Sequence, residues 1–214
     1  MTDTNEQNKV IPIGYPELDK LLDGGLRNGE LIMTTEDNAE YMDVALLLSI
    51  AENVCNSGGS VLFSSFAKTK DYLFKKMKEH HFNSFDRFLC IDDMSGTLSD
   101  IRTTISASLN HVNLVCIDTL NYIHTDEGGL PSDDYVNAYN LSNMAALFNI
   151  PIMSSFIRSQ DQDKNVSILR FADIILNITA KVQSDKMEVS VNRQYHHPSI
   201  ELKADSYNWR FENI

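Results

Sequence analysis

One long stretch of this chain has neither positive charge nor glycine. Lysine and arginine are absent from residues 28–67, glycine is absent from residues 30–57, and the dipeptide Gly-Lys occurs nowhere in the 214 residues. A phosphate-binding loop needs glycines, so that backbone N–H groups can wrap the phosphates. It also needs a lysine on the β- and γ-phosphates and a Ser or Thr on Mg²⁺. The usual means of binding a nucleoside triphosphate are therefore missing here.

Cysteines and long apolar runs are also scarce. Cys55, Cys90 and Cys116 form no Cys-x-x-Cys pair, so we expect buried free thiols in a reducing compartment. No apolar run approaches the ~20 residues that cross a bilayer, and the polar, acidic N-terminus is unlike a signal peptide. These absences favour a cytoplasmic protein with no membrane partner.

The charge balance is strongly acidic, with a formal net charge of -12 at pH 7. Nucleic-acid binding depends largely on Lys and Arg side chains that meet phosphates and release counterions. The one basic stretch, residues 68–78, is typical of the solvated face of a helix. We therefore expect no strong binding of nucleic acid by the chain alone.

The order of apolar patterns predicts the fold class. Hydrophobic residues make up 43% of the chain and charged residues 22%, as in an ordinary globular domain. Strand-like runs alternate with helical patterns, which predicts an α/β fold with a mainly parallel sheet and helices on both faces. The last two strands, joined by the loop 194–199, predict an antiparallel C-terminal edge hairpin. Expected strands cover residues 31–34, 61–63, 88–91, 114–117, 150–153, 174–176, 187–191 and 200–202, and expected helices cover residues 44–54, 71–80, 99–109 and 135–148.

The remaining segments carry simpler expectations. Residues 1–10 are expected to be disordered, residues 11–214 to form a single domain, and residues 125–134 to form a mobile loop. Thr97 or Ser99 is expected to cap the helix that follows. The pairs His80–His81 and His196–His197 are expected at the surface, because adjacent side chains diverge on a helix and face opposite sides of a strand.

Several segments resemble the RecA-like domain of replicative DNA helicases of the DnaB type. Residues 11–19 (IPIGYPELD) and 24–31 (GGLRNGEL) are similar to the entry of that domain, an opening shared with KaiC and RadA proteins of the wider P-loop NTPase superfamily. Residues 89–96 (LCIDDMSG) resemble the DnaB pattern of a strand that ends in paired aspartates. Residues 114–121 resemble the Walker B strand, with Asp118 as its aspartate. Residues 149–152, 172–175 and 210–214 are similar to later strands and to the closing residues.

The resemblance implies a RecA-like fold from residue 11 to the end, and it also implies what is missing. The family's catalytic glutamate falls on Ala67, and its sensor glutamine falls near Ile157. Its finger lysine and arginine fall on Val191 and Arg193, so Asp118 and Arg193 are the remnants of the ATP machinery. The primase-binding domain and the subunit-linking helix have no counterpart in these 214 residues. The phosphate loop falls on Glu36, Asp37, Asn38, Ala39, Glu40, Tyr41, Met42 and Asp43, with four carboxylates and no Gly, Lys or Thr in place.

Three hypotheses about function follow. The first is a catalytically degenerate RecA-fold protein, a pseudoenzyme without cofactor, that interacts with or regulates proteins of DNA replication and helicase assemblies. The second is an ATP-dependent DNA helicase or ATPase that uses ATP and Mg²⁺ at an unorthodox site. The third is a metal-binding or small-ligand-binding protein, in which Asp118 holds a divalent ion with Glu36 or Asp37 and further oxygen ligands.

The surviving arginine suggests how a protein partner could be held. In the helicase family an arginine of one subunit reaches the phosphates bound by its neighbour, and a carboxylate accepts the same forked hydrogen bonds. We therefore expect Arg193 to meet Glu36, Asp37, Glu40 or Asp43 of a second copy or of a related helicase subunit. The alternative is that Arg193 is a solvated hairpin residue in a monomer.

Overall fold

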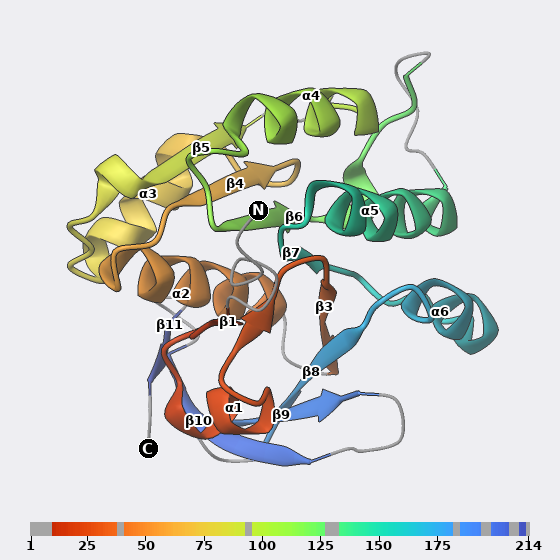
Figure 1. Cartoon of the computed structure of the whole chain (residues 1–214). Coiled ribbons are helices and arrows are strands. Elements are labelled where there is room, and N and C mark those ends of the chain that lie inside the picture. Colours follow the sequence, from red (N-terminus) through yellow and green to blue (C-terminus); the bar gives the residue numbers. More distant parts are fainter. Residues whose placement is uncertain are drawn as a thin grey trace, which may run out of the picture.

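A nine-stranded sheet forms the centre of the molecule (Figure 1). The computed structural model describes residues 10–37, 41–92, 96–126, 133–181, 185–193, 198–205 and 210–212. From one edge of the sheet to the other, the strands are β11 (Arg210–Glu212), β10 (Ser199–Asp205), β9 (Lys186–Asn192), β8 (Ile174–Ala180), β3 (Leu31–Asp37), β7 (Ile152–Ser155), β6 (Leu114–Asp118), β4 (Val61–Ser65) and β5 (Phe88–Asp92).

The two parts of this sheet differ in direction. All neighbouring strands from β8 to β5 pair in parallel. The pairs β8–β9, β9–β10 and β10–β11 are antiparallel. The expected mainly parallel sheet with an antiparallel C-terminal edge is therefore confirmed.

Helices cover both faces of the sheet, because successive strand residues face opposite sides. Ile32 belongs to the core shared with α1 (Pro16–Leu21), α2 (Met42–Asn56) and α3 (Lys70–Glu79). Met33 belongs to the core shared with α4 (Leu98–Ser108), α5 (Asp134–Phe148) and α6 (Gln162–Leu169). The helical turns η2 (Phe85–Arg87) and η3 (Leu120–Tyr122) and the ribbon of β1 (Val10–Ile11) with β2 (Leu26–Arg27) complete the described elements.

Helix α2 is buried on nearly all sides, since 13 of its 15 residues are buried. It packs between the sheet and β11, and its first residues follow directly from the carboxyl end of β3. A helix that is apolar all round needs such a position. Its two ends therefore define two separate regions, one at the sheet edge and one beside β11.

Several local expectations are confirmed. Thr97 caps α4 in a reciprocal box with Asp100. Cys55, Cys90 and Cys116 are buried and free. Helix α3 buries Leu73 and Met77 and exposes most of its lysines, as a solvated basic face requires. No helix in the described part of the chain is long and apolar enough to cross a membrane.

Other expectations need correction. Strand β3 continues past residue 34 to Asp37. The sequence did not predict α1, α6 or β11; α6 is largely polar, and its N-terminus is stabilised by the Asp161 side chain. Val10 pairs with Arg27, so it does not belong to a disordered segment. The predictions for residues 1–9, 127–132 and 194–197, which include the His196–His197 pair, lie outside the described residues.

The prediction that His80 is exposed is wrong. Its side chain is 2% exposed, and its Nδ1 lies 2.8 Å from Glu52 Oε1 on α2. The chain turns sharply after α3, where His81 adopts a left-handed conformation with φ 59°. His80 thus ends the helix on the side that faces α2, which an argument from adjacent residues alone does not reveal.

Candidate functional site at the start of helix α2

The parallel strands β3, β7 and β6 end at one edge of the sheet, beside the first turn of α2. Ligands of open α/β sheets bind at such carboxyl edges. The last residues of these strands are Asp37, Ser155 and Asp118. This edge is therefore the place to look for chemistry.

The Glu36 carboxylate accepts hydrogen bonds from the start of α2. Its Oε1 lies 3.2 Å from the backbone nitrogen of Tyr41, and its Oε2 lies 2.7 Å from that of Met42 and 3.3 Å from that of Asp43. The first N–H groups of a helix have no acceptor inside the helix and favour a negative charge. Glu36 thus uses the donors that a P-loop offers to a phosphate.

The phosphate-loop pattern Gly-x-x-x-x-Gly-Lys-Ser/Thr, laid on residues 36–43, places Tyr41 at the second glycine and Met42 at the lysine. Tyr41 adopts the left-handed conformation, with φ 66°, and its side chain is half-exposed. Met42 is 1% exposed, so an apolar side chain lies buried where a P-loop would present a cation. Residues 38–40, which include the predicted site residues Asn38, Ala39 and Glu40, lie outside the described residues.

Asp43 stands where the motif has its Ser or Thr, and it is 3% exposed. Burial raises the pKa of its carboxyl to about 8, and the negative charges of Glu36 and Asp118 add to that rise. Its Oδ1 accepts a hydrogen bond of 2.7 Å from the backbone N–H of Val44. At neutral pH the carboxyl of Asp43 is therefore mainly protonated.

Asp118 is completely buried at the end of β6. Burial raises the pKa of its carboxyl to about 6, while the Ser65 hydroxyl, which donates to Oδ2 at 2.9 Å, and the charge of Lys68 lower it. Its Oδ1, like the hydroxyls of Thr34 and Ser155, is buried without a hydrogen-bond partner among the residues that the structure describes. In the same part of the chain, no group of three or more His, Cys, Asp or Glu is placed to hold a metal ion.

Two cations lie near these carboxylates, and the sequence analysis assigned neither to the site. Arg158 donates to Asp37 at 2.8 Å, and Asn177 donates to the other oxygen of Asp37 at 2.8 Å. Lys68, which follows Ala67, lies with its Nζ 4.8 Å from the centre of the Tyr41 ring. The signal in the sequence was weak, because Arg158 is one residue past the position aligned with the family's sensor glutamine.

Arg193 lies elsewhere, just past the end of β9. Its guanidinium donates to Glu30 at 2.7 Å and to Asp23 at 3.2 Å, both of the same chain. The structure thus brings Glu36, Asp43 and Asp118 together and leaves Arg193 outside their group. The pairing of Arg193 across a subunit contact stays a prediction, and it would require the guanidinium to leave these two partners.

Comparisons with known proteins identify the fold. No family model and no curated protein matches the sequence. The solved ATPase domain of a DnaB-like helicase superposes with a TM-score of 0.79 at 14% identity, over 99% of this chain and 93% of that one. "The Structure Of A DnaB-Like Replicative Helicase And Its Interactions With Primase" gives 0.78 at 14% identity, over 99% of this chain and 63% of that one. "Crystal structure of the RadB recombinase" gives 0.68 at 16% identity, over 96% and 100%.

These likenesses confirm the resemblance at the level of the fold, which is RecA-like as in DnaB-like helicase ATPase domains. The chain spans less than two thirds of the length of the DnaB-like replicative helicase chain. Because the sequence identities are all low, the activity of these proteins is not transferred with their fold.

Proposed function

We propose that this chain is a catalytically degenerate RecA-fold protein that does not use ATP and acts by binding other proteins. The observation that carries the proposal is the contact of the Glu36 carboxylate with the first three N–H groups of α2. A phosphate would have to displace this carboxylate before it could use the same donors. An anion supplied by the chain itself competes at very high effective concentration.

The charges around Glu36 support the same proposal. Glu36, Asp37 and Asp118 are carboxylates beside the start of α2, against which the described cations are Lys68 and Arg158. Arg158 is already paired with Asp37. Like charges 4 Å apart repel by about 4 kcal/mol at an effective dielectric of 20, so a triphosphate would be strongly disfavoured here.

The test is calorimetric titration of Mg-ATP and Mg-ADP into the folded chain. We expect no saturable heat at any practical nucleotide concentration. A dissociation constant in the low micromolar range would overturn the proposal and favour the second hypothesis, an ATPase with an unorthodox site. Addition of Mg²⁺ alone is the matched control, because heat from Mg²⁺ without nucleotide would support the metal-binding hypothesis instead.

For the partner, the resemblance favours a related helicase subunit or a second copy of this chain, since subunits of that family contact one another through their arginine fingers. The experiment is gel filtration of the chain with and without a purified DnaB-like helicase from the same cell, followed by assay of the helicase's ATP hydrolysis. We expect a joint complex and a changed rate of hydrolysis. Separate elution with an unchanged rate would remove the helicase as the partner.

A further inference from the structure

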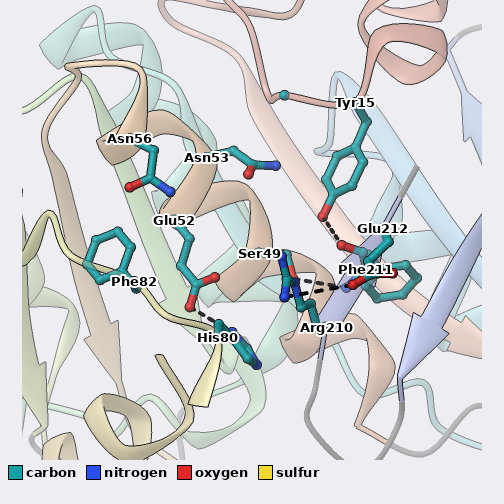
Figure 2. Close-up of a pocket in the computed structure, with 11 residues that line it drawn as sticks. Tyr15, Ser49, Glu52, Asn53, Asn56, His80, Phe82, Arg210, Phe211 and Glu212 are labelled. Atoms are coloured by element: carbon teal, nitrogen blue, oxygen red, sulfur yellow. Dashed lines mark hydrogen bonds and ion pairs between the residues drawn. The ribbon is translucent and has the colours of Figure 1, made fainter. Parts of the chain in front are cut away.

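A second polar region lies at the other end of α2, beside β11. A pocket of about 230 Å³ opens there, lined by side chains of α2, of the turn after α3 and of β11 (Figure 2). It is about 14 Å along the helix from Asp43, since nine residues separate Asp43 from Glu52 at 1.5 Å each. The pocket is therefore distinct from the candidate site at the sheet edge.

The floor of the pocket contains a buried carboxylate. The side chain of Glu52 is 9% exposed, and one of its oxygens, Oε1, lies 2.8 Å from His80 Nδ1. Figure 2 shows the other oxygen turned away from His80. Within the described part of the chain, no residue donates a hydrogen bond to this second oxygen. One half of a buried anion thus remains open to a donor from the pocket.

The charge of Glu52 is incompletely balanced. Burial raises the pKa of this carboxyl, even though the hydrogen bond from His80 and the charges of His80 and Arg210 lower it. Buried charges are stable only when they are paired and hydrogen-bonded, so a further cation beside Glu52 would be favourable. Arg210 does not fill this role, because its guanidinium lies 3.7 Å from Glu212 at the rim.

Neighbouring side chains add acceptors rather than donors. Asn53 donates its amide Nδ2 to the carbonyl of Ile13, which leaves its oxygen available as an acceptor. Ser49 accepts a hydrogen bond from the backbone N–H of Phe211 at 3.3 Å. An anion entering the pocket would meet Glu52 and Glu212, whereas a cation would gain from both.

We infer that this pocket binds a small organic cation, an alkylammonium or guanidinium group, with Glu52 as its charge partner. An ammonium offers three donors and a guanidinium offers five, which match the open oxygens of Glu52 and Asn53. The volume corresponds to roughly seven water molecules at ~30 Å³ each, so the ligand is of the size of a short amine or of a Lys or Arg side-chain end.

The probes that test this inference are n-butylamine, methylguanidine and butyrate, each titrated into the full chain and followed by NMR shifts of backbone amides. We expect both cations to shift the signals of Ser49, Asn53 and His80 and to saturate, and butyrate to leave them unchanged. Nα-acetyl-lysine amide separates the two sources of the ligand: tighter binding than butylamine indicates a side chain of a protein partner, and weaker binding indicates a free amine. Saturation by butyrate, or no shift from either cation at tens of millimolar, overturns the inference.

Three variants sharpen the test. Glu52→Gln should weaken the binding of butylamine by more than about tenfold, as loss of a buried charge partner does. Arg210→Gln should tighten it by up to about fivefold, because a partly exposed like charge is removed. Glu212→Gln should weaken it slightly. Arg210 and Glu212 are exposed, so their variants report even if Glu52→Gln does not fold. Loss of all binding in Arg210→Gln would identify an anion site and contradict the inference.

Discussion

Glu36 Oε2 lies 2.7 Å from the backbone nitrogen of Met42, at the first turn of α2. The side chain that would be a P-loop lysine is instead buried and apolar, and the anion at the helix start belongs to the chain. An internal carboxylate therefore takes over the stabilising role that a bound phosphate has at such a helix terminus. This relationship makes the site measurable through folding stability as well as through ligand binding.

Glu36→Ala should lower the free energy of unfolding by about 1 kcal/mol, because the first turn of α2 loses its capping anion. Urea denaturation at pH 6 is the measurement, since Asp43, with a pKa of about 8, is then protonated and its repulsion from Glu36 is absent. Glu36→Gln, which keeps the acceptor oxygen, should lose less. Glu17→Ala is the control, because the Glu17 side chain is 73% exposed and its ion pair with Lys20 is long. Equal losses for Glu36→Ala and Glu17→Ala would contradict the capping role.

Asp43 should make the protein less stable as the pH rises. The pKa of its carboxyl rises from 3.8 to about 8 in the folded chain. Between these values the folded state keeps a proton that the unfolded state has lost, so the free energy of unfolding falls as the pH increases and levels off above about 8. Asp118, with a pKa of about 6, adds to the fall over the lower part of this range.

Asp43→Asn should therefore flatten the profile between pH 6 and 8. Two pH units at about 1.4 kcal/mol each limit the difference from wild type to about 3 kcal/mol. Denaturation curves at a series of pH values measure it, with the exposed Asp163→Asn as the matched control. Parallel profiles for wild type and Asp43→Asn would mean that Asp43 ionises normally in the folded chain.

DNA should not bind tightly to the isolated chain. The net charge is -12, and the exposed lysines of α3 form only a short basic face. Because affinity for DNA comes mainly from released counterions, few lysines give a weak complex at physiological salt. An electrophoretic shift assay with single- and double-stranded DNA should show no complex at micromolar protein. A submicromolar complex that weakens with salt and is lost in Lys75→Glu would show that α3 binds nucleic acid.

Sequence patterns predicted the sheet and the larger helices because these elements follow apolar periodicity, which is local. The acidic loop was also visible, since Glu36, Asp37 and Asp43 are close in sequence. The contact of Glu36 with α2 was not, because it depends on the left-handed turn at Tyr41. The pairs Glu52–His80 and Asp37–Arg158 join residues 28 and 121 positions apart. Only the packing of the helices and strands brings such residues together.

Arg193 provides the last test, because it separates the two expectations for assembly. In the single chain its guanidinium donates to Glu30, whose side chain is 15% exposed, and to Asp23. Arg193→Glu would place a carboxylate beside Glu30, and we expect it to lower the free energy of unfolding by about 1 kcal/mol. Lys20→Glu, a reversal at a side chain that is 78% exposed, should cost less.

The same variant tests the mass of the protein in solution. Since Arg193 is held by its own chain, we expect light scattering to give a monomer for wild type and for Arg193→Glu, at low and at high salt alike. A wild-type oligomer that dissociates in high salt and is lost in Arg193→Glu would contradict this. It would instead support the contact that the sequence suggested, in which Arg193 leaves Glu30 to meet Glu36, Asp37 or Asp43 of a neighbouring subunit.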